Sequence, residues 1–252
     1  MSAPVVLAGL PRAISSETDG WEAEPLRPGR NAVEAWRLRQ VGRPDRVLKR
    51  QPATWDRGLD AELARLEWLE REAPLLRAPR PLAFAGGDVC YLLTTALDGV
   101  GAADLLGTDA ESGLTALLGQ ALRELHRIDP GGCPFDAGLD AAVAAAVRRV
   151  GEGRADGAVL AEIRRRRPPR EHVVVTHGDF CLPSVLVDRF GRGGLVELAS
   201  MGLASRWRDL AVAARSLRAG LGEDAVGVFL HAYGIEPDAE LLAFYELLDD
   251  LV

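Results

Sequence analysis

Three residues in the sequence have types and positions that suit phosphate chemistry: Lys49, Asp179 and Glu197. Lysine and arginine together number 30 among the 252 residues, yet Lys49 is the single lysine. Because the planar fork of arginine cannot replace a compact ammonium in a tight site, this exception indicates a phosphate contact for Lys49. Asp179 lies in a predicted loop after a strand, and Glu197 ends the following predicted hairpin. A phosphate-holding lysine with acids that orient a nucleophile and bind magnesium is what metal-assisted phosphoryl transfer requires.

Each of these three residues also has an interpretation in which it takes no part in a reaction. A single lysine can survive by chance, Asp179 can cap its loop, and Glu197 can be an exposed strand residue. Residue types and spacing leave these alternatives open. Whether the three residues can act together depends on the helices and strands that position them.

Hydrophobic periodicity predicts a strand-rich first part of the chain and a mainly helical second part. The elements expected in the first part are strands at 36–40, 46–49, around Phe84 and at 89–95, and a helix over 59–71. The helices expected in the second part are 114–128, 141–150, 159–165 and those from Arg208 onward, interrupted at 220–222 and 234–237. Three strands, at 173–175, 185–187 and 195–197, surround Asp179. The predicted fold class is therefore α+β, with an N-terminal lobe over 1–95, a hinge over 96–99 and a helical C-terminal lobe over 100–252.

Composition narrows the classes of function. Hydrophobic residues make up 48% of the chain and charged residues 27%, as in a globular protein. A net charge of −7 argues against a nucleic-acid partner and suits a cationic small molecule. No apolar run approaches the roughly 20 residues of a membrane span, and no signal peptide is expected. Three widely spaced cysteines predict neither disulfides nor zinc, which favours the cytoplasm.

The segment His177-Gly-Asp-Phe-Cys-Leu-Pro-Ser184 resembles the catalytic loop HGDxxxxN of the aminoglycoside phosphotransferases, in the form found in the 3′-phosphotransferases. Further similarities follow in the family's order. They are Val47-Leu-Lys49, Glu62 in Ala61–Leu69, Leu92–Gly99, Leu125-His-Arg-Ile-Asp129, Leu203–Ala211 and the last segment Tyr245–Val252. The resemblance runs almost from end to end, and it implies a two-lobed fold like that of the protein kinases.

The resemblance also implies roles for individual residues, with ATP or GTP and Mg²⁺ as cofactors. For the nucleotide these are Lys49 on the phosphates, Glu62 beside Lys49, Asn31 in the phosphate-covering loop, and Thr95 and Leu97 at the adenine. For the reaction they are Asp179 at the substrate hydroxyl, Ser184 and Glu197 at the metal, and His177 and Asp209 as supports of the loop. For the amino sugar they are Glu152, Asp156, Asp249 and Asp250.

The chain departs from the family pattern at the metal and at the substrate. Ser184 stands in place of an asparagine and Glu197 in place of an aspartate, and Ala199 replaces a glycine. Because magnesium demands tight octahedral geometry, these changes predict a weakened metal site. Ala219 and Gly220 stand where many relatives carry acids, which predicts weak binding of polycations.

The function expected from these patterns is ATP-dependent phosphorylation of a hydroxyl on an aminoglycoside or a related amino sugar, in antibiotic resistance or biosynthesis, by a monomer or homodimer. Two alternatives stay open. One is a catalytically impaired, kinase-like protein that binds a nucleotide or small molecule. The other is a kinase of a different small metabolite.

Overall fold

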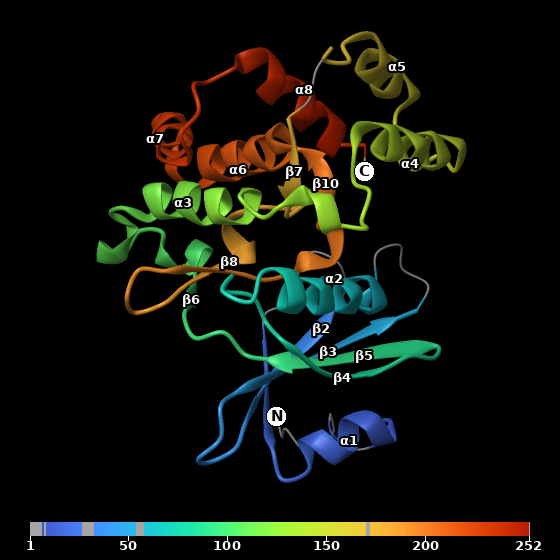
Figure 1. Cartoon of the computed structure of the whole chain (residues 1–252), viewed down its shortest axis with the longest axis vertical. Coiled ribbons are helices and arrows are strands. Elements are labelled where there is room, and N and C mark those ends of the chain that lie inside the picture. Colours follow the sequence, from blue (N-terminus) through green and yellow to red (C-terminus); the bar gives the residue numbers. More distant parts are fainter. Residues whose placement is uncertain (1–6, 8, 27–32, 54–57, 170–171, 252) are drawn as a thin grey trace. The chain divides into compact units, whose positions relative to one another are not determined.

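The computed structural model describes residues 7, 9–26, 33–53, 58–169 and 172–251. The chain forms two compact units, 1–98 and 99–252. The first unit is built on an antiparallel sheet and the second is mainly helical (Figure 1), which confirms the predicted α+β class. The candidate residue Asn31 lies outside the described residues.

The first unit contains a five-stranded antiparallel sheet, in strand order β1-β2-β3-β5-β4, and two helices. The elements are α1 (Arg12–Thr18), β1 (Glu22–Pro25), β2 (Glu34–Arg39), β3 (Arg46–Pro52), α2 (Leu59–Glu72), β4 (Pro81–Ala85) and β5 (Val89–Thr95). The expected hairpin, helix and later strands are all present. Periodicity does not reveal β1, because Ala23 is the one buried residue in this short strand.

Side chains along the central strands β3 and β5 point alternately to the two faces of the sheet, and the two faces have different neighbours. Leu48 of β3 and Leu93 of β5 are direct partners, are fully buried, and share a core with Ile14 of α1. Because successive side chains on a strand point to opposite faces, Lys49 points away from this core and meets Glu62 of α2. Figure 1 shows α1 and α2 on opposite sides of the sheet. The strand pairing therefore sends Lys49 toward α2.

The second unit combines two small sheets, β7-β10 and β6-β8-β9, with long helices. Its strands are β6 (Val100–Gly101), β7 (Val173–Thr176), β8 (Val185–Val187), β9 (Gly193–Leu195) and β10 (Gly202–Ser205). Its α-helices are α3 (Leu114–His126), α4 (Leu139–Gly151), α5 (Gly157–Arg165), α6 (Arg206–Leu221), α7 (Asp224–Tyr233) and α8 (Ala239–Asp249). Short 3₁₀ turns η5 (Leu182–Ser184) and η6 (Leu198–Ser200) flank the β8–β9 hairpin.

Helix α6 is the core of the second unit. It packs against α7, α8 and β7, and fully buried Leu210, Ala211 and Ala214 provide its apolar surface. The three strands expected around Asp179 belong to two sheets, because loop 177–184 separates β7 from β8. The strand expected at 195–197 is wrong beyond Leu195, since Glu197 leaves the extended conformation.

Candidate active site

Lys49 and Glu62 form a short, shielded ion pair within the first unit. The Lys49 Nζ atom lies 2.6 and 2.8 Å from the two Glu62 carboxylate oxygens. The two side chains are 15% and 5% exposed, so water screens the pair weakly. Glu62 lies in the first turn of α2, where the helix dipole favours a negative charge. The ammonium group is thus held in one position, and the third of its three N–H donors is left for an anion.

The expected hinge residues, Thr95 and Leu97, end the first unit. The Thr95 N–H donates to the Arg80 carbonyl, and the Thr95 hydroxyl accepts from the Arg80 N–H, both at 2.9 Å. The Leu97 carbonyl lies 3.5 Å from the Arg37 guanidinium. The Leu97 N–H has no hydrogen-bond partner among the described residues. Leu97 therefore has an unused backbone donor, while the Thr95 N–H and hydroxyl are engaged with Arg80.

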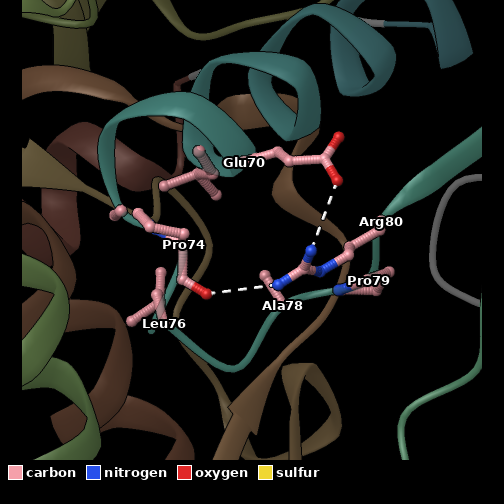
Figure 2. Close-up of a pocket in the computed structure, with 8 residues that line it drawn as sticks. Glu70, Pro74, Leu76, Ala78, Pro79 and Arg80 are labelled. Atoms are coloured by element: carbon pink, nitrogen blue, oxygen red, sulfur yellow. Dashed lines mark hydrogen bonds and ion pairs between the residues drawn. The ribbon is translucent and has the colours of Figure 1, made fainter.

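A small hollow in the first unit does not resemble a ligand site. It lies between the end of α2 and the start of β4 (Figure 2), and its volume of about 10 Å³ would hold roughly one water. The Arg80 guanidinium crosses it to Glu70 at 3.5 Å and to the Pro74 carbonyl at 3.4 Å. These contacts anchor the start of β4, the strand that pairs with β5.

We expect Lys49→Ala to abolish labelling of this protein by a lysine-directed nucleotide acyl phosphate. Lys49 is the single lysine in the chain, so a labelled lysine peptide reports this position alone. Mass spectrometry of the digested protein, with excess ATP as competitor, measures the label. Lys49→Arg is the matched variant that keeps the charge, and it should keep the melting temperature while failing to label. Labelling of Lys49 that ATP does not suppress would contradict a phosphate role.

Loop 177–184 leaves β7 through a turn that only glycine allows. Gly178 has a φ of +86°, and a Cβ there would lie 2.2 Å from the Ser200 carbonyl oxygen. This turn places Asp179 half-buried on the loop. The Asp179 carboxylate accepts no hydrogen bond from any residue that the structure describes. A partly shielded carboxylate without a protein donor is able to accept one from a substrate hydroxyl.

Asp209 of α6 binds the backbone at the start of this loop through hydrogen bonds. Its carboxylate accepts from the His177 N–H at 2.6 Å, from the Gly178 N–H at 2.8 Å and from His126 Nε2 at 3.0 Å. The Asp209 side chain is fully buried. Burial raises the pKa of this carboxyl, but the hydrogen bonds and charges of His126 and His177 oppose it, and the net pKa lies below the ordinary value. The carboxylate is therefore ionised at neutral pH and fixes the start of the loop.

His126 and Tyr233 extend this support to two other helices. The Nδ1 atom of His126 lies 2.8 Å from the Tyr233 hydroxyl, so α3 and α7 are both connected to Asp209. His177 Nε2 lies 3.0 Å from the Val196 carbonyl, which connects the loop to the residue before Glu197. Sequence reasoning assigned support to His177 and Asp209, but it missed Tyr233, whose distance along the chain hides the contact.

Ser184 and Ser216 close the other end of the loop. The Ser184 hydroxyl accepts from the Cys181 N–H at 2.9 Å and lies within hydrogen-bond distance of the Cys181 and Asp179 carbonyls. This side chain has no exposed surface. Ser216 Oγ accepts from the Leu182 N–H at 3.0 Å. Sequence reasoning missed Ser216, although its place two helical turns after Asp209 puts both on one face of α6.

Glu197 has an unusual backbone conformation at the start of η6. Its φ and ψ are 63° and 49°, and it is the one non-glycine residue with positive φ among the described residues. Such a conformation costs of the order of 1–3 kcal/mol and persists where the surroundings enforce it, often at functional sites. The preceding residue is fixed to the loop, because the Val196 N–H donates to the Ser184 carbonyl at 3.0 Å. The strained residue is the expected metal ligand.

The acids expected to hold an amino sugar all have partners within the chain. Arg215 of α6 forms ion pairs with Asp249 and with Asp250, the latter at 2.8 Å. Glu152 pairs with Arg154. The Asp156 carboxylate accepts from the Ala158 N–H at 2.8 Å and caps α5. The structure thus brings Asp249 and Asp250 together on Arg215 and leaves Glu152 and Asp156 in local contacts of the α4–α5 region.

Comparison with known proteins places these features in a class, the kinase-like phosphotransferases. The chain belongs to the phosphotransferase enzyme family, whose model matches residues 22–245. It is 34% identical to an aminoglycoside 3′-phosphotransferase of Streptomyces fradiae over 226 residues, which cover 81% of this chain and 84% of the relative. These matches confirm the resemblance to the 3′-phosphotransferases.

Two solved structures are similar over nearly the whole chain. The crystal structure of an aminoglycoside 3′-phosphotransferase of type VIII matches with a TM-score of 0.83 and 31% identity, over 96% of this chain and 97% of that one. The aminoglycoside phosphotransferase APH(3″)-Id of Streptomyces rimosus, in complex with ADP and streptomycin, matches with a TM-score of 0.76 and 26% identity. This second match covers 95% of this chain and 96% of the Streptomyces rimosus chain. The expected kinase-like fold is confirmed.

Two kinds of feature are absent from the described residues. None of the helices there has the length and apolar character needed to cross a membrane. No three histidine, cysteine or acidic side chains in this part of the chain gather where they could hold a metal ion.

Proposed function

We propose that this protein is an ATP-dependent O-phosphotransferase acting on a hydroxyl group of an aminoglycoside or a related amino sugar. The observation that carries the proposal is the Asp179 carboxylate. It is half-buried on a loop whose backbone is fixed by hydrogen bonds, and it receives no hydrogen bond from the described residues. Asp209 and Ser216 already satisfy the loop backbone, so Asp179 is left for a substrate. Family membership and the ADP and streptomycin bound to the Streptomyces rimosus relative support the choice of ligands. Three buried cysteines without a disulfide suit a cytoplasmic enzyme.

In this proposal the first unit binds the nucleotide. Lys49, oriented by Glu62, contacts the phosphates as a fixed positive charge. The Leu97 N–H meets the adenine or guanine ring, Thr95 lies beside this contact at the end of β5, and Asn31 covers the phosphates. The second unit provides the reaction centre, where Asp179 accepts the hydrogen bond of the acceptor hydroxyl and aligns its oxygen for attack on the γ-phosphorus.

Glu197 and Ser184 are the proposed magnesium ligands. Bound magnesium supplies charge neutralisation on the phosphates. Magnesium in phosphate sites commonly uses one or two carboxylates, with phosphate oxygens and waters as the other ligands, so the site requires no cluster of three acids. Glu197 fits this pattern as an exposed carboxylate on a strained backbone. The Ser184 hydroxyl keeps one lone pair beyond its hydrogen bonds to the loop.

We expect Glu197→Gln to weaken Mn²⁺ binding to the ADP-loaded protein at least tenfold, because the neutral amide removes the hard anionic ligand. Electron paramagnetic resonance of free Mn²⁺ measures the affinity without requiring turnover. Glu236→Gln, at an exposed position in the loop between α7 and α8, is the matched control and should bind Mn²⁺ like the starting protein. An unchanged affinity in Glu197→Gln would exclude Glu197 as a ligand.

Acceptor-dependent release of ADP tests the proposed function. The purified chain is incubated with ATP and millimolar Mg²⁺ or Mn²⁺, with and without streptomycin, kanamycin, neomycin or glucosamine. ADP release that requires one of these acceptors, with a phosphorylated product by mass spectrometry, supports the proposal. Nucleotide binding without release in any condition would support a non-catalytic, nucleotide-binding protein. Release that requires a hydroxyl compound other than an amino sugar would favour the kinase of a different metabolite.

A further inference from the structure

Helices α3 and α7 lie side by side (Figure 1) and approach each other closely at Gly119 of α3. A Cβ at Gly119 would lie 2.7 Å from the Phe229 carbonyl oxygen and 2.8 Å from the Tyr233 backbone nitrogen. Any larger residue would therefore push the two backbones apart. His126 follows Gly119 by two helical turns and lies on the same face of α3. The close packing thus places Tyr233, the last residue of α7, next to His126.

The position of Tyr233 is fixed where α7 ends. Gly234 has a φ of +92°, and its N–H donates to the Leu230 carbonyl at 2.9 Å and to the His231 carbonyl at 3.0 Å. Tyr233 is 6% exposed, and its ring meets the His126 ring edge-on with the ring centroids 5.5 Å apart. Burial raises the pKa of the Tyr233 hydroxyl. The hydroxyl therefore keeps its proton at neutral pH and is held against His126.

The ionised Asp209 carboxylate determines the direction of the hydrogen bonds through His126. A carboxylate only accepts, so His126 Nε2 donates to Asp209 Oδ2 at 3.0 Å. The other ring nitrogen, Nδ1, then faces the Tyr233 hydroxyl at 2.8 Å. A hydroxyl can both donate and accept, so Tyr233 satisfies Nδ1 whether or not this nitrogen carries a proton. Because His126 is buried, the loss of the hydroxyl would leave Nδ1 without a comparable partner.

The Asp209 oxygen that binds His126 also holds the start of the loop. Oδ2 accepts from the His177 N–H at 2.6 Å, while Oδ1 accepts from the Gly178 N–H at 2.8 Å. If the His126 ring turns, Oδ2 loses one of its two donors and the carboxylate is no longer held in a single orientation. Asp179 follows Gly178 directly, so a change in these contacts moves the carboxylate that aligns the acceptor hydroxyl.

We propose that Tyr233 is a positioning residue for phosphoryl transfer, which acts through His126 and Asp209 and makes the rate of the reaction depend on the packing of α7 against α3. The inference rests on the proposed function and adds to it a residue that acts from another helix. Tyr233 fixes the orientation of the His126 ring, and the ring fixes the orientation of the Asp209 carboxylate. Substrate binding does not use this series of contacts, so the effect falls on kcat and not on KM.

Steady-state kinetics of Tyr233→Phe tests the effect on the reaction. The variant keeps the aromatic ring and removes only the hydroxyl group. We expect kcat to fall about fivefold or more, with the KM values for ATP and for the acceptor within about twofold, because the loop is displaced while the binding groups remain. Tyr91→Phe on β5 is the matched control, since it removes a tyrosine hydroxyl from the first unit, and it should leave kcat unchanged.

His126→Gln tests whether Tyr233 acts through His126. The glutamine amide can still donate to Asp209, but it has no ring nitrogen that faces Tyr233. We expect His126→Gln alone to lower kcat about fivefold, and the addition of Tyr233→Phe to cause less than about a twofold further change. A further fivefold loss in the double variant would overturn the route through His126.

Amide hydrogen exchange, measured by nuclear magnetic resonance, tests the positioning without requiring turnover. Tyr233→Phe should accelerate exchange of the His177 and Gly178 N–H groups about tenfold, because their acceptor is less well held. The Leu203 N–H, which donates to the Phe135 carbonyl at 2.7 Å, should keep its exchange rate. Equal acceleration at Leu203 would indicate general destabilisation and overturn the inference. Unchanged exchange and unchanged kcat in a folded Tyr233→Phe would overturn it as well.

His126→Gln keeps the inference decidable if Tyr233→Phe does not fold. The His177 and Gly178 N–H groups should then exchange about tenfold faster in His126→Gln, and unchanged exchange there would overturn the inference. Failure of the proposed function would instead appear as no ADP release from the starting protein with any acceptor. In that case the exchange rates would still decide whether Tyr233 orders the loop.

Discussion

Asp179→Asn should lower kcat for acceptor phosphorylation by about 10²–10⁴-fold, the usual contribution of a positioned acid–base group. The asparagine amide has almost the same size, but it cannot accept a proton from the acceptor hydroxyl. Lys49 and Glu62 are in the other unit and keep their ion pair, so nucleotide affinity should stay within about twofold. Initial rates of ADP release and fluorescence titration with a nucleotide analogue measure the two quantities.

The matched control is Asp109→Asn, which changes an exposed carboxylate in the segment before α3. It should leave the rate and the melting temperature unchanged. A variant at Asp179 that retains more than about a tenth of the starting rate would assign the reaction to a different base. A parallel loss of nucleotide binding would indicate a folding defect instead of a chemical one.

Asp209→Asn should lower the free energy of unfolding by about 2–5 kcal/mol, because its partners were arranged for a buried carboxylate. The amide has one acceptor oxygen where the carboxylate accepts from His177 N–H, Gly178 N–H and His126 Nε2. At least one buried donor then loses its partner, and the start of the Asp179 loop loosens. We therefore expect kcat to fall together with stability, whereas the KM for ATP should change little. Urea unfolding and steady-state kinetics measure these effects.

The pH dependence of unfolding distinguishes the charge of Asp209 from its shape. The folded-state pKa of Asp209 lies below its unfolded value, so its stabilising contribution is complete above the unfolded pKa of about 3.9. This contribution is lost as the pH falls through the folded pKa. The free energy of unfolding should decline more steeply below about pH 4 in the starting protein than in Asp209→Asn. Parallel curves for the two proteins, with Asp109→Asn as a third, would contradict an ionised Asp209.

Local patterns in the sequence are sufficient to predict most elements and the residues that carry charge in the candidate site. Alternation over 46–49 and the leucine spacing over 59–71 predict the strand and helix that hold Lys49 and Glu62. Gly178 before Asp179 indicates a turn, because glycine readily adopts the positive φ that the structure shows there. These features are visible in the sequence since strand alternation, helical spacing and glycine turns depend on neighbouring residues.

The partners of the site residues depend on tertiary structure. Tyr233 lies more than a hundred residues from His126, and Arg215 reaches Asp249 and Asp250 only because α6 packs against α8. Ser184 illustrates the same limit. The family resemblance implies a metal ligand at this position, and the sequence does not reveal that the hydroxyl also binds the backbone of its own loop.

Glu197 shows most directly what the sequence by itself determined and what only the folded chain decided. The acidic residue type and its place after the hairpin follow from the sequence, and both indicate a hard oxygen ligand. Its left-handed backbone does not, since a glutamate in isolation disfavours that conformation. In the folded chain Glu197 lies between Val196, which donates to the Ser184 carbonyl, and the turn of η6. The sequence thus determines which chemical groups the site contains. Backbone strain and ion-pair partners arise from contacts between segments that are distant along the chain.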